Sequence, residues 1–295
     1  MSKPKLLWLQ SITCNGNTHS FFNLQNFDAL MRTFDVLYHP LLETPYCLED
    51  IYTKELACDV LILEGAFKSR GHKKFDKETY ALAKEYSKRA KYTITMGSCA
   101  TFGGVFKEAQ EHTIAGFCFN KEQKRPTYKQ YINTLISLPG CPAHPKWLAY
   151  VLEMILQKRK IEVDEFYRPI EIFAYTAHAG CVRNEYFEWK IDVKNYGEKE
   201  GCLFYENGCR GPFTNANCNK MLWNDISSKT RVGTPCFGCT EPSFPQRNLF
   251  STKTNMGIPA NMPFGIPARA YLSVTGVTKS FRIKRFTQPL MEYKK

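Results

Sequence analysis

The residues with the most evident chemistry are the 12 cysteines of this 295-residue chain. Seven possible metal ligands gather in its C-terminal part: His178, Cys181, Cys202, Cys209, Cys218, Cys236 and Cys239. Zinc binds thiolate and imidazole in tetrahedral sites, and iron-sulfur clusters use such ligands equally well. This density predicts metal binding and leaves the choice of metal open.

Three further cysteines each follow a strand-like run. Cys14 comes after "KLLWLQ", Cys99 after "YTITMGS" and Cys141 after "YINTLISLPG". Because open α/β sheets hold their ligands beyond the carboxyl ends of the strands, these thiols should converge on one crevice. Nearby glycines let the backbone approach a bulky inorganic group. Three thiolates are one fewer than a four-cysteine cluster site needs, and Asn17 stands where a fourth cysteine would be expected.

The elements that must position these thiols are predicted by the hydrophobic pattern. Strands are expected at 5–10, 34–38, 59–63 and 92–96, and helices at 21–34, 77–91 and 145–160. Ser20 and Asp76 are suited to cap the first two helices, and Pro145 suits the first turn of the third. Alternating strands and helices predict an α/β fold with a parallel sheet covered on both faces.

Beyond about residue 165 the chain becomes rich in Gly, Asn, Pro and Cys, with few periodic segments. We therefore predict two domains, a sheet domain over 1–165 and an irregular cysteine-rich domain over 166–295. Because the second domain has little periodic apolar sequence, its core must be held by something else, and the metal ligands are the obvious candidates.

Composition limits the partners and the compartment. The formal net charge of +12 reflects scattered Lys and Arg clusters with no nucleic-acid-binding motif, so we expect a solvated surface and no nucleic acid. We find no apolar run long enough to span a membrane and no secretion leader, so we expect a cytoplasmic protein without a direct membrane span. Cytosolic thiols are kept reduced, which favours metal binding over disulfides.

Several motifs together resemble one known family. They are "WLQSITCNG", "CDVLILEGAF", "GSCATFGG", "LPGCPAHPKWL", the His178 and Cys181 pair, "GCRGPFTNANC" and "GTPCFGCTEPSFP". Their order and approximate spacing resemble the small, electron-transferring subunit of nickel-iron hydrogenases, over nearly the whole chain. The resemblance implies a flavodoxin-like N-terminal domain and a C-terminal domain wrapped around iron-sulfur clusters. It also implies a large partner subunit with the catalytic nickel-iron site, and an external redox partner.

The same resemblance assigns three sets of ligands. The set matching the proximal cluster, nearest the nickel-iron site, is Cys14, Cys99 and Cys141. The set matching a distal four-iron (4Fe-4S) cluster is His178, Cys181, Cys202 and Cys209. The set matching a medial three-iron (3Fe-4S) cluster is Cys218, Cys236 and Cys239. The small subunit itself has no catalytic residue.

The chain departs from the family pattern at the proximal site. Asn17 replaces a cysteine ligand, and His19 stands where an acidic residue is common. A four-iron cluster could take Asn17, His19 or solvent as its fourth ligand, a three-iron cluster could form on the thiolates, or the site could be empty. Cys47 is a weak candidate substitute. Asparagine is also a common turn residue beside glycine, and we favour that role for Asn17.

The remaining cysteines and histidines are expected to have structural roles. Cys47, Cys58 and Cys118 lack partners at ligand spacing, so we expect buried free cysteines there. His39, His72, His112 and His144 are expected at the surface or in packing.

Glu64 could face a subunit interface or a proton path, and a hydrogen bond to a nearby turn is at least as plausible. Between Cys202 and Cys209 there are six residues where the family usually has five, which puts that turn in question.

Two other functions remain open. One is the small subunit of a hydrogen-sensing regulatory complex with slow turnover. The other is a non-catalytic scaffold or zinc-binding protein that has lost the proximal cluster. The related quinone-reductase subunit of respiratory complexes shares the N-terminal fold, but it has adjacent cysteines at its cluster and no long cysteine-rich domain, so we set it aside.

Overall fold

The computed structural model describes residues 2–108, 113–119, 132–189 and 191–245, with the single positions 270, 273 and 277. The chain divides into two compact units. The first contains Met1–Ala174 and Cys239–Pro245, and the second contains Tyr175–Gly238 and Gln246–Lys295. The first unit thus continues past residue 165 and takes in a segment from much later in the chain.

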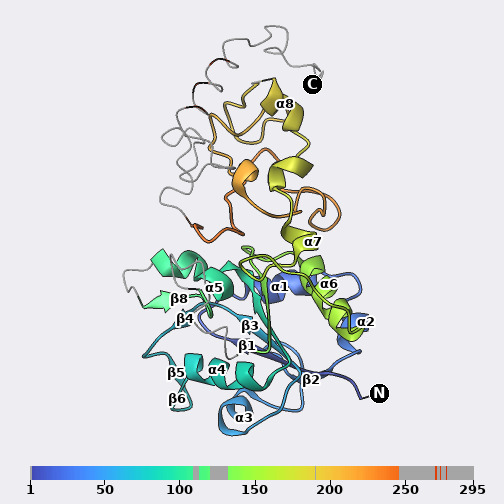
Figure 1. The fold of residues 1–295 in the computed structure, drawn as a ribbon, viewed down its shortest axis with the longest axis vertical. Coiled ribbons are helices and arrows are strands. Elements are labelled where there is room, and N and C mark those ends of the chain that lie inside the picture. The colour runs from blue at the N-terminus through green and yellow to red at the C-terminus, as the bar shows by residue number, and fades with distance from the viewer. Residues whose placement is uncertain are drawn as a thin grey trace. The chain divides into compact units, whose positions relative to one another are not determined.

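The first unit is built on a five-stranded sheet, whose ribbon can be followed in Figure 1. Its strands are β1 (Lys5–Gln10), β2 (Asp35–Tyr38), β3 (Val60–Glu64), β7 (Tyr92–Met96) and β9 (Thr134–Leu138). They lie in the order β2-β1-β3-β7-β9, and every neighbouring pair is parallel. The predicted α/β fold is confirmed.

Alternation along β1 shows how both faces of the sheet are covered. Leu7 and Leu9 point into a buried apolar cluster with Leu82 and Tyr86 of α4 (Thr79–Arg89). Trp8 points the other way and stacks on Phe21 of α1 (Gly16–Phe22), with ring centroids 5.9 Å apart. Helix α6 (Pro145–Leu156) packs beside α1.

The helices differ in detail from those predicted. The segment 21–34 is not one helix, because α1 ends at Phe22 and a turn separates it from α2 (Phe27–Met31). Ser20 is therefore no cap; it lies inside α1 and donates its hydroxyl to Ala143 O at 2.7 Å. Asp76 has φ 61° in a turn between two short strands, so the expected cap there was also wrong.

The short elements of the first unit lie in its loops. They are the antiparallel pairs β4 (Phe67–Lys68) with β8 (Ile114–Ala115) and β5 (Lys73–Lys74) with β6 (Lys77–Glu78), and the helices α3 (Leu48–Thr53), α5 (Gly97–Phe102), η1 (Gly104–Glu108) and α7 (Ile170–Phe173). Pro145 does begin α6, as expected, and His144 caps it by accepting from Lys146 N at 3.2 Å.

The second unit has little regular structure among its described residues. Its helices are η3 (Ala177–Gly180), α8 (Asn184–Glu188) and η4 (Gly211–Phe213). Its two apolar clusters contain thiols: one joins Val193 and Leu203 to Cys209 and Cys236, and the other surrounds Cys202 with aromatic rings. Potential metal ligands thus occupy the positions that aliphatic residues would fill in an ordinary core.

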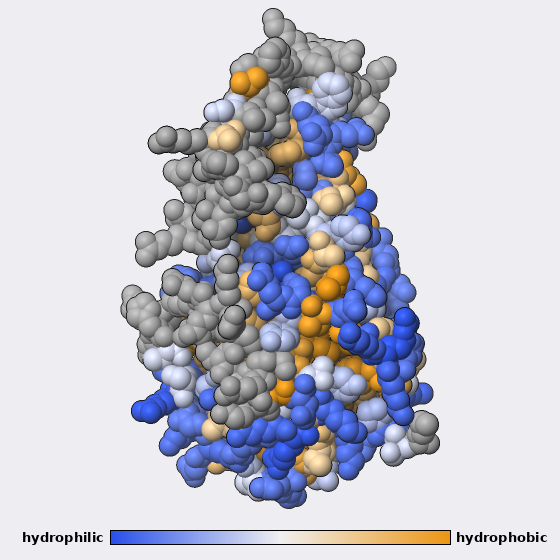
Figure 2. All heavy atoms as spheres, in the orientation of Figure 1, coloured by the Kyte–Doolittle hydropathy of each residue, from blue (hydrophilic) through white to orange (hydrophobic). Residues whose placement is uncertain are grey.

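The surface is predominantly polar on the face seen in Figure 2, where a band of hydrophobic side chains runs between hydrophilic ones on the first unit. Within the part of the chain that the structure describes, no helix has the length and apolar character to cross a membrane. The basic tail at 279–295 and His112 lie outside the described residues.

Candidate metal centres

The four residues of the predicted distal set line one pocket in the second unit. His178, Cys181, Cys202 and Cys209 all contribute to its wall, and its empty volume is about 310 Å³, including space open to solvent. A single turn of helix places the first two together: Thr176 caps η3 by accepting from Ala179 N, and Cys181 N donates to His178 O at 2.9 Å.

The loop between the other two residues accommodates its extra residue. Cys209 N donates to Leu203 O at 3.0 Å, and Gly208 N donates to Phe204 O at 3.1 Å. Gly208 has φ 62°, a left-handed conformation that glycine adopts without steric cost. The altered spacing therefore still brings Cys202 and Cys209 to the same pocket.

The pocket offers soft donor atoms, without a preformed site for one ion among the described residues. In the described segments, no three His, Cys, Asp or Glu side chains are grouped closely enough to hold a single metal ion. Cys202 and Cys209 are buried, and burial raises the pKa of Cys209 well above its ordinary value, with the neighbouring Cys236 adding to the shift. Binding a metal would displace the thiol proton. Three thiols and one imidazole around an open pocket match the donor set of an iron-sulfur cluster.

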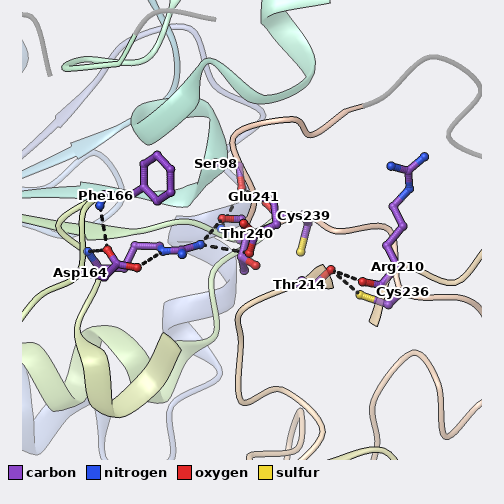
Figure 3. Close-up of polar contacts among 11 residues, drawn as sticks. Ser98, Asp164, Phe166, Arg210, Thr214, Cys236, Cys239, Thr240 and Glu241 are labelled. Atoms are coloured by element: carbon purple, nitrogen blue, oxygen red, sulfur yellow. Dashed lines mark hydrogen bonds and ion pairs between the residues drawn. The ribbon is translucent and has the colours of Figure 1, made fainter. Parts of the chain in front are cut away.

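Cys218 and Cys236 lie in the same unit, close to this pocket. Cys236 N donates to Cys209 Sγ at 3.3 Å. Cys236 Sγ contacts Thr214 Oγ1 at 3.6 Å, and Figure 3 shows this contact as a dashed line. Burial, followed by the effect of Cys236, raises the pKa of Cys218 to about 12. The third member of the predicted medial set, Cys239, belongs to the first unit. That set remains a prediction.

Cys239 begins a segment that the first unit holds by several polar contacts. Ser98 donates its hydroxyl to Cys239 O and accepts from Gly140 N at 2.9 Å. Lys107 Nζ donates to Pro242 O at 2.6 Å. The contacts of Ser98 tie the Cys239 backbone to the helix that carries Cys99.

Arg168 makes two further attachments to this segment. Its guanidinium group donates to Thr240 O and Glu241 Oε1, both at 3.1 Å, and to Asp164 Oδ2 at 2.7 Å (Figure 3). Arg168 is buried, and it also lies over the ring of Phe166. Sequence reasoning missed Arg168 and Lys107 because a lone basic residue carries no local signal of a buried, long-range contact.

The predicted proximal thiols follow their strands as expected. Cys14 comes after β1, Cys99 lies in α5 directly after β7, and Cys141 follows β9. Cys99 is buried, whereas Cys14 and Cys141 are exposed. Burial raises the pKa of Cys99 to about 12, with further contributions from Cys141 and Cys14, so the three thiols influence one another electrostatically. A Cβ on Gly104 would lie 2.6 Å from Cys99 Sγ, which explains the glycine there.

Asn17 has a structural role in this arrangement. Its side chain is buried, and Oδ1 accepts a hydrogen bond from Ala143 N at 2.8 Å. The amide packs against Gly97, where a Cβ would come within 2.3 Å of Nδ2. Asn17 therefore holds the turn through its side chain. A left-handed backbone occurs two residues earlier, at Asn15, with φ 60°.

His19 and Cys47 are not brought to the thiols in the way that a substitute ligand requires. His19 is exposed, and two residues along a helix correspond to a rotation of about 200° away from the buried Asn17. Cys47 is exposed at the start of α3, which lies at the opposite end of the first unit from α1 and α5 (Figure 1). The expectations that Cys47 is buried or could replace a ligand were wrong, whereas Cys58 and Cys118 do pack in the core.

Glu64 is the buried centre of a hydrogen-bond network. It ends β3, has no exposed surface, and accepts hydrogen bonds from Trp8 Nε1 and Gln10 Nε2, both at 3.0 Å. It also accepts from the backbone N–H groups of Asn17 and Thr18 at 3.1 Å. The predicted hydrogen bond to a nearby turn is confirmed.

Comparison with known proteins identifies the class. Residues 173–251 match the family model for the C-terminal region of the NiFe/NiFeSe hydrogenase small subunit, and residues 14–155 match the model of the NADH ubiquinone oxidoreductase 20 kDa subunit. The chain therefore contains a domain of the NiFe/NiFeSe hydrogenase small subunit family and is similar to proteins named as hydrogenase small subunits.

Individual relatives agree. The chain is 29% identical to the F420 non-reducing hydrogenase II small subunit of Methanosarcina mazei, over 87% of this chain and 78% of that protein. It is 28% identical to the periplasmic [NiFe] hydrogenase small subunit 1 of Nitratidesulfovibrio vulgaris, over 82% and 80% of the two chains. The fold matches the actinobacterial-type NiFe-hydrogenase from Ralstonia eutropha H16 with a TM-score of 0.72 at 21% identity, covering 100% of this chain and 94% of that one.

Proposed function

We propose that this chain is the iron-sulfur electron-transfer subunit of a nickel-iron hydrogenase. It would relay electrons between the nickel-iron site of a large partner subunit and an external redox partner, during hydrogen oxidation or proton reduction. The observation that carries the proposal is the pocket lined by His178, Cys181, Cys202 and Cys209. Similarity to such subunits supports the partner, since relatives named as small subunits match over most of their length.

Each cluster would supply one-electron redox chemistry, and the chain's residues would hold it and limit its contact with water. The distal four-iron cluster would bind at the described pocket. The medial three-iron cluster would use Cys218, Cys236 and Cys239, and the proximal cluster would use Cys14, Cys99 and Cys141. Hydrogen bonds to sulfur and burial are the means by which a protein tunes such groups, and the contact from Cys236 N to Cys209 Sγ is one of them.

For the proximal site we favour a cluster held by three thiolates alone. The carbonyl oxygen of Asn17 already accepts from Ala143 N, and its amide is packed against Gly97. A three-iron cluster, or a four-iron cluster with solvent as its fourth ligand, needs no fourth protein ligand and would leave this hydrogen bond intact.

Metal analysis tests both proposals. The protein would be purified anaerobically with the partner it retains, its iron, sulfide and zinc would be quantified, and electron paramagnetic resonance spectra recorded oxidised and reduced. About ten irons per chain indicate three clusters with three irons at the proximal site, and about eleven indicate four irons there. About seven irons would mean an empty proximal site, and zinc without iron would overturn the electron-transfer proposal.

A cytoplasmic location forms part of the same proposal. Its support is the cysteine-rich composition, because a reducing compartment keeps thiols available for clusters. One relative is named as periplasmic, so cell fractionation with a periplasmic marker enzyme is the appropriate measurement. Recovery with the periplasmic marker would contradict this location.

A further inference from the structure

Arg183 is a buried basic residue in the wall of the distal pocket. It lies two positions after Cys181 and lines the pocket together with His178, Cys202 and Cys209. Only 3% of its surface is exposed. Its backbone N–H donates to Cys181 Sγ at 3.4 Å. Arg183 is thus attached to one ligand by its backbone and forms part of the wall of the same pocket.

The guanidinium group is held by neutral acceptors. Nε donates to Thr230 O at 2.6 Å, Nη1 to Gly201 O at 2.8 Å and Nη2 to Glu198 O at 2.5 Å. The carboxylate of Glu198 is engaged elsewhere, because it accepts from the Asn195 backbone N–H at 3.1 Å. Three carbonyl oxygens fix the orientation of the cation without cancelling its charge.

The thiols around the pocket are among the groups that favour the charged form of Arg183. Burial lowers the pKa of Arg183, and the thiols of Cys181, Cys202 and Cys209, together with Tyr186, oppose that shift. Removing a cation from water is costly unless opposite charge lies nearby. Thiolates that hold a cluster would be that opposite charge, which gives a reason for a buried arginine at this place.

We infer that Arg183 raises the reduction potential of the cluster held by His178, Cys181, Cys202 and Cys209, and so favours its acceptance of an electron. This inference rests on the proposed function. A cluster bound by three thiolates and a neutral imidazole is anionic, and reduction adds one electron and one further negative charge without breaking a bond. A buried cation stabilises the reduced form more than the oxidised form. Arg183 is a charge-tuning residue, whose guanidinium group is held by three backbone carbonyls beside the pocket.

The test compares two variants of the anaerobically purified, cluster-loaded complex in a redox titration of the four-iron resonance signal. Arg183→Met removes the charge and should lower the potential. A tenfold smaller ratio of reduced to oxidised cluster at the wild-type midpoint corresponds to about 59 mV for one electron. Arg183→Lys keeps the charge and should stay near the wild-type potential, although it loses donors to carbonyls. Arg183→Gln serves as a second neutral variant if the methionine variant does not accumulate.

Two controls make the outcome specific. Arg159→Met removes an exposed arginine from the first unit and should leave the potential unchanged. His178→Cys exchanges the neutral imidazole ligand for a thiolate. The resonance signal whose reduction potential changes in this variant therefore belongs to the distal cluster. The inference would be overturned if Arg183→Lys and Arg183→Met shifted the reduction potential equally. It would also be overturned if neither neutral variant, Arg183→Met or Arg183→Gln, shifted it. A wild-type protein without a four-iron signal would overturn the proposed function as well.

Discussion

His39 is a buried histidine that links pH to stability at the scale of one residue. Its ring lies 4.9 Å from the Trp8 ring, and its Nδ1 accepts from Leu41 N at 3.2 Å. Burial lowers the pKa of His39 to about 4 from an ordinary 6.5, and Glu64 only partly opposes the shift. The folded protein therefore favours the neutral ring.

The stability that this neutral ring contributes should be present above pH 6.5 and be lost as pH falls towards 4. The linked loss is about 3 kcal/mol over that window, because the unfolded chain binds the proton first. His39→Asn keeps an acceptor for the Leu41 N–H without titrating, so its unfolding free energy should fall less steeply on acidification. Urea unfolding at several pH values measures this slope. His19→Asn, at an exposed position, should keep the wild-type slope, and an unchanged slope in His39→Asn would contradict the prediction.

At the same scale, local chemistry explains only part of the proximal turn. An asparagine beside glycine is typical of turns, and Asn15 does adopt the left-handed backbone. That Asn17 is buried against Gly97 could not be predicted, because Gly97 follows a different strand. Glu64 was recognised as a hydrogen-bond acceptor for a turn, while its donors Trp8 and Gln10 become neighbours only when β1 pairs with β3.

At the scale of elements, the junction between β7 and α5 depends on Gly97. Gly97 has φ +87° and its missing Cβ leaves room for the Asn17 amide, whereas Gly71 has φ +81° with nothing within 4 Å of the added Cβ. Gly71→Ala should cost about 1 to 2 kcal/mol of unfolding free energy from backbone strain alone. Gly97→Ala should cost roughly a further 1 to 3 kcal/mol, because it also overpacks the turn.

The difference between these two alanine variants, measured by denaturant unfolding, isolates the packing contribution. Gly97→Ala should also lower the iron bound at the proximal site, while Gly71→Ala should not. Equal destabilisation by the two substitutions would mean that the Asn17 amide moves away at no cost.

The segment 239–245 depends on Arg168. Arg168→Met should destabilise the first unit by about 2 to 4 kcal/mol, because it leaves the Asp164 and Glu241 carboxylates without their cation while both keep partial contact with solvent. Denaturant unfolding measures the loss, and limited proteolysis should show faster cleavage within 239–245.

An exposed ion pair provides the matched control. Lys91 pairs with Asp59 at 2.7 Å, and the lysine side chain is 73% exposed. Lys91→Met should change stability by no more than about 1 kcal/mol. Similar losses of unfolding free energy in Arg168→Met and Lys91→Met would show that the burial of Arg168 adds nothing to the stability of the first unit.

The elements themselves were predictable to different degrees. The strands were found because they are short apolar runs that end in glycine or polar residues, and β3 reads "VLILE" with every residue buried. Helix α6 was found from its apolar face and Pro145. The predicted helix at 21–34 failed because the chain turns after Phe22, where tertiary contacts such as that of Phe21 with Trp8 outweigh the local periodicity.

At the scale of the whole molecule, the two units should respond differently to loss of the clusters. The first unit has a sheet with apolar clusters on its helices, while the apolar clusters of the second include Cys202, Cys209 and Cys236. Chelation and oxidative removal of iron should therefore expose 175–238 to protease. Cleavage in this segment should be at least tenfold faster than in the cluster-loaded protein. Mass spectrometry of the early fragments locates the cuts.

The first unit serves as the internal control in that experiment. Fragments that retain 1–174 should persist, because the buried strands do not depend on metal for their packing. Early cleavage within β1 or β3, at the same rate as in the second unit, would contradict this difference.

The sequence by itself determined the kinds of ligands, their order and the strands that they follow, because thiols, glycines and short apolar runs are local features. It also indicated a family resemblance, through motifs spread over most of the chain. Only the tertiary structure decided that four of these ligands share one pocket with a buried Arg183, that Asn17 is engaged by Ala143, and that Arg168 holds Glu241. The reason is physical: burial and hydrogen bonding of these groups depend on residues far away in the sequence, which become neighbours only when the chain folds.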